Sequence, residues 1–119
     1  MSSEFTLSQI FGAMARHATE AQRVSATNVA HANQPGYKAM ELESFQDFLA
    51  RVTAGHAQDG LQSSFRMIQS TTPVAPNGNS VSLEMEAYKS AEAMGEHTLA
   101  LTVYGKTMDL MRTALGKGR

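Results

Sequence analysis

Apolar residues recur every three or four positions along the first part of the chain. This interval is typical of an amphipathic helix with one apolar side. No proline interrupts the pattern before Pro35, so we predict one helix of roughly 27 residues that begins near Glu4 and ends near Asn33. Its apolar positions are Leu7, Ile10, Phe11, Met14, Ala18, Ala21, Val24, Val29 and Ala32.

Turn and extended segments are predicted after this helix. Pro35 disfavours helical backbone at the residue before it, and Gly36 tolerates a positive φ, so we predict a type II turn there. From Tyr37 to about Glu43 we expect extended chain. A short helix is then predicted from apolar residues at helical spacing, namely Phe45, Phe48, Leu49 and Val52.

Residues 53–80 are rich in Gly, Ser, Thr, Gln and Pro. One brief apolar run, residues 65–68, is a candidate strand, and the Asn77-Gly78 dipeptide predicts a tight turn. We therefore predict a linker or an irregular protrusion that joins the first half of the molecule to the second.

A second long helix is predicted from about Ser82 to Leu115. Ser82 can accept a hydrogen bond from a terminal backbone N–H, and Glu84 and Glu86 lie where the helix dipole favours anions. Arg112 and Lys117 lie near the opposite end. The apolar residues have the spacing of a coiled-coil seam: Met94, Leu101, Tyr104, Met108, Met111 and Leu115.

The predicted fold is mainly all-α. The two terminal helices form a coiled-coil-like hairpin, and residues 1–34, 35–81 and 82–119 make one structural unit. A lone hairpin buries little, and both helices have more apolar width than one partner covers, so we expect other chains to pack against them. On the first helix, the predicted interface residues are Leu7, Ile10, Met14, Ala21, Val24 and Asn28; on the second they are the six seam residues above.

Composition narrows the possible functions. The 119 residues carry 10 basic and 11 acidic side chains, and this balance argues against nucleic acid as a partner. There is no cysteine, and no apolar run is long enough for a membrane span or a cleaved secretory signal.

The histidines and glutamates are the residues whose chemistry could serve a catalytic or metal-binding site. His17, His31, His56 and His97 form no H-x-x-x-H pair, and Asn77-Gly78 is followed by no Gly-Lys-Ser/Thr ending. Helix-dipole compensation accounts for Glu84 and Glu86. We therefore predict no catalytic, metal-binding or cofactor-binding residues, and no enzymatic activity.

Two segments resemble a known family. NVAHANQPGYKA, residues 28–39, resembles the N-hydrophobic-A-N-A-x-T-P-G-Y-K pattern of bacterial flagellar rod, hook and related axial proteins. NGNSVSLEME, residues 77–86, resembles their D-G-N-x-V-D-L-E-x-E pattern. The resemblance covers the whole chain and is greatest to proximal rod subunits. His31, Gln34, Asn77 and Ser82 stand where the family commonly has Asn, Thr, Asp and Asp.

The resemblance implies a structural subunit of the basal-body rod, a part of the flagellum that transmits torque and surrounds the export channel. It implies export by the flagellar type III apparatus without a cleaved signal, and assembly in the periplasm. The implied partners are copies of the chain, other rod subunits, the export gate and basal-body ring or adaptor proteins. Pro35, Gly36 and Tyr37 are expected to set where the chain leaves the helical tube. The other motif and turn positions are Asn33, Asn77, Gly78 and Asn79.

Two asparagines near the end of the first helix have different expected roles, and one alternative function stays open. Asn33 is expected to cap the first helix locally, whereas Asn28 is expected to make an interhelical contact that sets the register. The alternative function is a soluble cytoplasmic adaptor or chaperone that binds partner helices.

Overall fold

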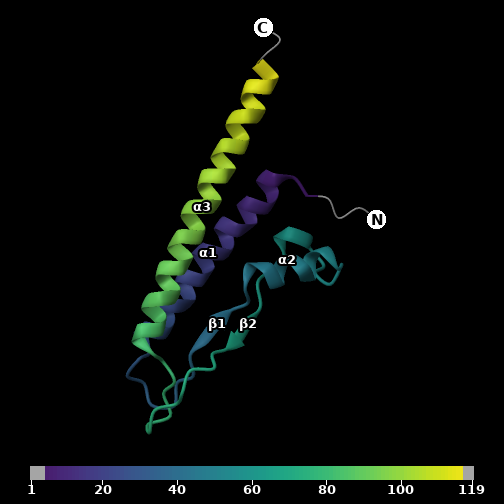
Figure 1. The fold of residues 1–119 in the computed structure, drawn as a ribbon. Helices are drawn as coiled ribbons and strands as arrows, with labels where there is room; N and C mark the ends of the chain where they lie inside the picture. Colours follow the sequence, from purple (N-terminus) through teal and green to yellow (C-terminus); the bar gives the residue numbers. More distant parts are fainter. Residues whose placement is uncertain (1–4, 117–119) are drawn as a thin grey trace.

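The computed structural model describes residues 5–116, so Lys117 and the outer ends of the two predicted terminal segments lie outside the described residues. Two long helices lie antiparallel, and the smaller elements lie on one side of them (Figure 1). The prediction of a mainly helical fold with two long terminal helices is confirmed. The elements in order are α1 (Leu7–Ala30), β1 (Met40–Leu42), α2 (Phe45–Thr53), the 3₁₀ turn η1 (Gly60–Gln62), β2 (Met67–Gln69) and α3 (Leu83–Gly116).

Helix α1 begins at a capping box. The Thr6 side chain accepts a hydrogen bond from the Gln9 backbone N–H at 3.1 Å, and the Gln9 side chain accepts one from the Thr6 N–H at 2.9 Å. The helix has 24 residues and ends at Ala30, where the following N–H, that of His31, bonds back to the last turn. It is shorter than predicted at both ends, because Thr6 has the extended backbone of a cap and residues 31–33 form turns.

The middle of the chain is more ordered than predicted. Ser44 caps α2 by accepting a hydrogen bond from the Asp47 N–H at 3.1 Å, and this short helix confirms the prediction. β1 and β2 form an antiparallel pair in which Met40 lies opposite Gln69 and Leu42 lies opposite Met67. The predicted strand at residues 65–68 is therefore present, shifted toward the C-terminus.

The main hydrophobic core lies between α1 and the middle segment. Phe48 is fully buried, and its ring centroid lies 4.6 Å from that of Phe65. The interpretation of residues 53–80 as a linker or irregular protrusion is wrong for the part around η1, because Leu61 belongs to this core. The buried cluster consists of Ala13, Phe45, Phe48, Val52 and Leu61.

The contact between α1 and α3 is made by small and polar side chains. Its buried α3 residues are Glu86, Ala93 and Ala100, which recur every seven positions and so share one face. The predicted seam placed Met94 and Leu101 in the helix contact. The residues buried there are instead Ala93 and Ala100, each one position earlier in the chain. Alanine buries little apolar area, so this contact contributes little hydrophobic stabilisation.

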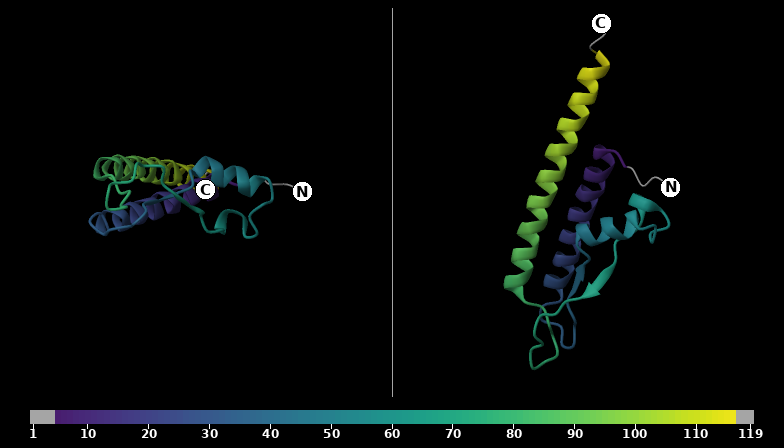
Figure 2. Two further views of the ribbon diagram at one scale, coloured as in Figure 1. Left: turned by 90° about the horizontal axis from the view of Figure 1, so that it is seen from below. Right: turned by 45° about the vertical axis from the view of Figure 1, so that its right-hand side comes forward.

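The molecule is markedly elongated. Its extents are 68 × 30 × 15 Å, and its radius of gyration is 17.8 Å; a compact chain of this length has about 13.5 Å. Helix α3 has 34 residues against 24 in α1, which makes it roughly 15 Å longer. Its C-terminal end therefore projects past the start of α1 (Figure 2).

Candidate interaction surface

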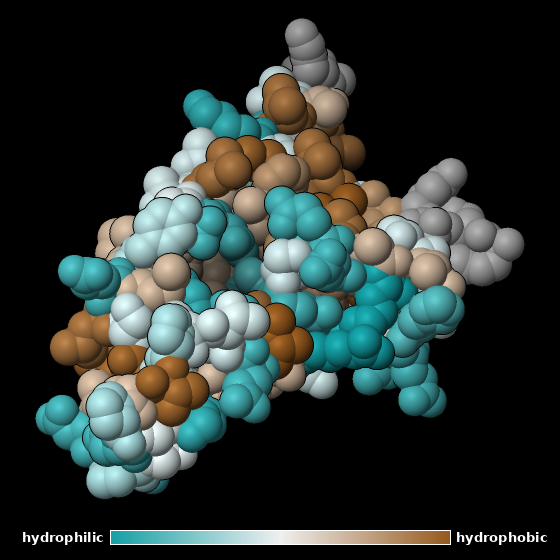
Figure 3. Space-filling view, turned by 60° about the horizontal axis from the view of Figure 1, so that its bottom comes forward, coloured by the Kyte–Doolittle hydropathy of each residue, from teal (hydrophilic) through white to brown (hydrophobic). Residues whose placement is uncertain are grey.

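An apolar surface runs along α3 beside the face that contacts α1. We call it the apolar stripe, and it consists of Met94, Leu101, Tyr104, Met108, Met111 and Leu115. Met94 is 59% exposed, Leu101 50% and Leu115 78%. In Figure 3, apolar side chains gather beside the grey C-terminal residues at the top of the view. Exposed apolar side chains that lie together on one side of a helix mark a contact with another molecule.

Helix geometry explains why most of the apolar stripe is exposed. Its positions recur at the coiled-coil interval, so they stay on one side of α3 from Met94 to Leu115. Tyr104, whose ring lies next to Gly12 of α1, and the half-buried Met108 are its partly covered members. α1 covers the neighbouring side and is too short to reach the last turns. Every residue from 109 to 116 is exposed, including the apolar Leu110.

A shallow groove adjoins the apolar stripe. Small residues form its floor, because Gly95 has no side chain and Ala91 has only a methyl group. Such small residues allow another helix to approach closely. The groove is lined by Ala91, Met94, Gly95, Thr98, Leu99 and Thr102.

The predicted interface residues of α1 divide into four that keep some exposed surface and two that are buried. Leu7 is exposed, whereas Ile10 and Met14 are partly buried against the core, and Ala21 lines a cleft between α1 and α3. The others, Val24 and Asn28, are interior, at 4% and 1% exposed. The prediction that these two contact another subunit is therefore wrong, because α3 and the middle segment already cover them.

Asn28 is a polar centre within the chain. Its Nδ2 donates to the backbone oxygen of Met40 at 2.7 Å and to Oε2 of Glu86 at 3.1 Å. Its Oδ1 accepts from the Met40 N–H at 3.1 Å and from the Tyr37 hydroxyl at 3.0 Å. This one amide joins α1 to β1, to α3 and to the turn that precedes β1.

The two sequence motifs meet in space. The Tyr37 N–H donates to the Gln34 oxygen at 3.2 Å and Gly36 has a φ of 77°, as the predicted type II turn at Pro35 requires. The Gly36 N–H donates to the Asn77 oxygen at 2.9 Å. The turn at Gly78, where φ is 86°, therefore packs directly on the Pro35-Gly36 turn.

Asn79, and not Asn33, satisfies the backbone at the end of α1. Its Nδ2 donates to the oxygens of His31 at 2.9 Å and Gln34 at 2.7 Å. Asn33 is exposed, and among residues 5–116 its side chain makes no hydrogen bond. The prediction of a capping role for Asn33 is wrong, because the capping group comes from the other motif.

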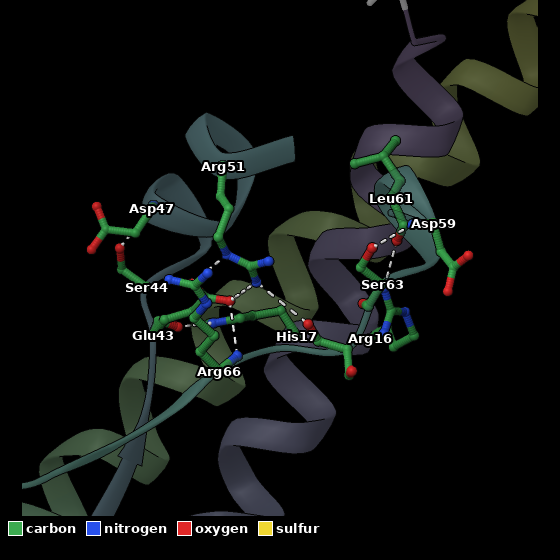
Figure 4. Close-up of polar contacts among 11 residues, drawn as sticks. Arg16, His17, Glu43, Ser44, Asp47, Arg51, Asp59, Leu61, Ser63 and Arg66 are labelled. Carbon is green, nitrogen blue, oxygen red and sulfur yellow. Dashed lines mark hydrogen bonds and ion pairs between the residues drawn. The ribbon is translucent and has the colours of Figure 1, made fainter. Parts of the chain in front are cut away.

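Three charged side chains hold the middle segment to α1 and to itself (Figure 4). Arg16 donates to the Leu61 oxygen at 2.6 Å, and Arg51 donates to Glu43 Oε2 at 2.6 Å. Burial alone would raise the pKa of Glu43, but hydrogen bonds from Arg51 and from the Arg66 N–H, together with their charges, lower it.

His17 lies at the junction of these elements. It is 5% exposed; its Nδ1 lies 2.6 Å from Glu96 Oε2 on α3, and its Nε2 lies 2.6 Å from the Glu43 backbone oxygen. Burial disfavours the charged ring, but these hydrogen bonds and the charges of both carboxylates raise its pKa above 6.5. Sequence reasoning missed this group and Arg16 because their partners lie far away in the chain and leave no local pattern.

Among residues 5–116, no three His, Asp or Glu side chains are placed to hold a metal ion. Over the same range, no helix is sufficiently long and apolar to cross a bilayer. No protein-family model and no curated protein matches this chain.

Proposed function

We propose that this chain is a structural subunit of the bacterial flagellar basal-body rod, of the proximal type. It leaves the cytoplasm through the flagellar type III apparatus without a cleaved signal and assembles in the periplasm. It packs against copies of itself and other rod subunits, next to the export gate and the basal-body ring or adaptor proteins. The observation that carries this proposal is the exposure of the apolar stripe of α3 within residues 5–116, where at least half of the surface of four of its side chains is open to solvent: Met94, Leu101, Met111 and Leu115.

The two resembling segments support the proposal through their position. They meet at the base of the helix pair, where Asn79 binds the end of α1 and Ser82 caps α3 by accepting from the Met85 N–H at 3.2 Å. A joint of this kind fixes where the middle segment leaves the two helices. In an axial protein, that position separates the helical tube from the part that projects outward.

Assembly adds the stability that the isolated hairpin lacks. Burying one leucine side chain contributes about 2 kcal/mol, so covering the apolar stripe is worth several times that amount before the entropy of association is subtracted. Because binding to the folded state stabilises it by mass action, a weakly docked α3 becomes rigid in the polymer. A rigid helical tube is the property that torque transmission requires.

Replacing Leu101 or Met108 with Asp tests the proposal. Each substitution places a charge in the apolar stripe, and Leu101 is half exposed, so the monomer should still fold and be exported. We expect Leu101→Asp and Met108→Asp to abolish rod assembly and motility. Thr113→Asp is the matched control, since this exposed residue lies on α3 away from the apolar stripe, and it should leave motility intact.

The readouts are motility, the amount of protein secreted and its presence in purified basal bodies. Normal motility in both stripe variants would contradict the assignment of this surface. Recovery of the wild-type chain in the cytoplasm, bound to a partner and absent from basal bodies, would favour the adaptor or chaperone alternative.

A further inference from the structure

Both ring nitrogens of His17 face hydrogen-bond acceptors. The backbone oxygen of Glu43 can only accept, so Nε2 must carry a proton to make the 2.6 Å contact. An ionised Glu96 can also only accept, so Nδ1 must carry one for its own 2.6 Å contact. A ring with both protons is an imidazolium, and the observed geometry therefore contains a bound proton.

Loss of that proton would break one particular contact. A neutral ring has a single N–H, so one nitrogen would point its lone pair at an acceptor oxygen. The Glu43 oxygen is fixed in the backbone next to the buried Phe45. The Glu96 side chain is 20% exposed and can turn toward water. Neutral His17 would thus keep Glu43 and release Glu96.

We propose that the His17–Glu96 pair is a proton-dependent clasp, that is, a contact that fastens α3 to α1 only while His17 is protonated. Deprotonation of His17 loosens the C-terminal part of α3, beginning at Glu96. The clasp is a property of the single chain and does not depend on the rod assignment.

The composition of the helix contact makes the clasp important. Around it the buried α3 residues are Ala93 and Ala100, which supply little apolar area. The other polar links lie nearer the start of α3, where Ser25 donates to the Glu86 backbone oxygen at 3.1 Å and Gln22 donates to the Ser90 oxygen at 3.4 Å. His17 is therefore the farthest of these links toward the projecting end of α3.

The charges around His17 favour its proton. The cleft beside the ring is lined by Glu86, Lys89, Glu92 and Glu96 from α3, Glu41 from β1, Glu43 from the β1–α2 junction and Asp47 from α2. Lys89 forms an ion pair with Glu41 at 2.8 Å, and Arg51 forms one with Glu43 at 2.6 Å. The charges of these two cations are therefore largely balanced by their own carboxylate partners. The excess of carboxylates agrees with the raised pKa of His17.

The sign of the pH effect follows from that direction. Because the folded-state pKa is raised, the stabilisation from the clasp is fully present below the usual value of 6.5. It is lost as the pH rises through the folded-state pKa. The equilibrium for opening α3 should increase about tenfold for each pH unit between these two values.

Hydrogen exchange of the full chain, corrected for intrinsic exchange rates, measures the opening directly. We expect amides of residues 96–107 to lose protection as the pH rises, while those around Asn28 keep theirs. Glu96→Gln is the sharp variant, because its amide N–H can donate to Nδ1 of a neutral ring that still donates to Glu43 through Nε2. It should keep α3 docked and abolish the pH dependence.

His56→Gln is the matched control, since His56 is exposed, and it should behave like the wild type. Protection of residues 96–107 that does not change with pH in the wild type would overturn the proposal. So would a pH dependence that survives in Glu96→Gln. The nitrogen chemical shifts of His17 give an independent measurement, and a ring with an unprotonated Nδ1 below pH 6.5 would also overturn it.

Discussion

The Asn28→Ala substitution tests whether a single buried amide holds the base of the hairpin together. Asn28 is 1% exposed and makes four hydrogen bonds, so alanine removes every one of them without exposing new surface. Alanine is also a good helix former, so α1 itself should persist. Any loss of stability therefore reports on the lost contacts.

The magnitude follows from the groups that lose their partner. The N–H and the oxygen of Met40 each lose a bond to Asn28, and Glu86 loses the donor to Oε2 while its Oε1 already has no partner. The Tyr37 hydroxyl is half-buried and can turn toward water. At roughly 1–3 kcal/mol for each buried group without a partner, the three groups together cost about 3–9 kcal/mol. That is a large share of the total stability of a chain this small.

Chemical denaturation followed by circular dichroism gives the measurement. We expect the midpoint to fall with little change in slope, because the surface exposed on unfolding stays nearly the same. Asn33→Ala is the matched control: it deletes the same side-chain atoms at an exposed position and should change the free energy of unfolding by less than about 0.5 kcal/mol. A loss below about 1 kcal/mol for Asn28→Ala would refute the reasoning.

Two further predictions concern the turns and the acid side of the stability profile. Gly78→Ala should destabilise more than Gly36→Ala, although both have positive φ: a Cβ at Gly78 would lie 3.1 Å from the Gly36 Cα, whereas nothing lies within 4 Å at Gly36. Thermal melting compares them, and equal losses would contradict the packing argument. The pKa of Glu43 is lowered in the folded state, so its ionised side chain stabilises the fold. This stabilisation is fully present above the usual carboxyl pKa of 4.5 and is lost as the pH falls through the folded-state pKa. The stability difference between wild type and Glu43→Gln should therefore shrink in acid, and a difference independent of pH would contradict the pairing with Arg51.

Local signals in the sequence predict the elements well. The spacing of apolar residues predicts α1, α2 and α3. In α1 and α2 the apolar side packs in the core, whereas in α3 the buried face is made of Glu86, Ala93 and Ala100. The Pro35-Gly36 and Asn77-Gly78 pairs predict turns because few other residues adopt the backbone angles needed there. Ser82 as the cap of α3 follows from the same local reasoning, and the observed hydrogen bond confirms it.

The arrangement of the elements was harder to predict, for a physical reason. Sequence reasoning placed the large apolar residues of α3 in the seam, but Ala93 and Ala100 face α1 instead. Small residues give no strong hydrophobic signal, and a periodic pattern does not say whether its partner is in the same chain. The Asn28 contacts were missed likewise, because Glu86 lies 58 positions away along the chain.

The observed division of side chains gives the two surfaces of α3 different roles. The contact with α1 relies on hydrogen bonds from Asn28, Ser25 and His17, which are directional and satisfied in only one register. The apolar stripe, including Leu101, has no such directional constraint, and its attraction scales with the area that a partner covers. Polar contacts thus define the fold of the single chain, while much of the apolar area stays exposed, and this is the area that the proposed rod assembly would bury. A substitution in the first set should therefore lower monomer stability, and one in the second should lower assembly alone.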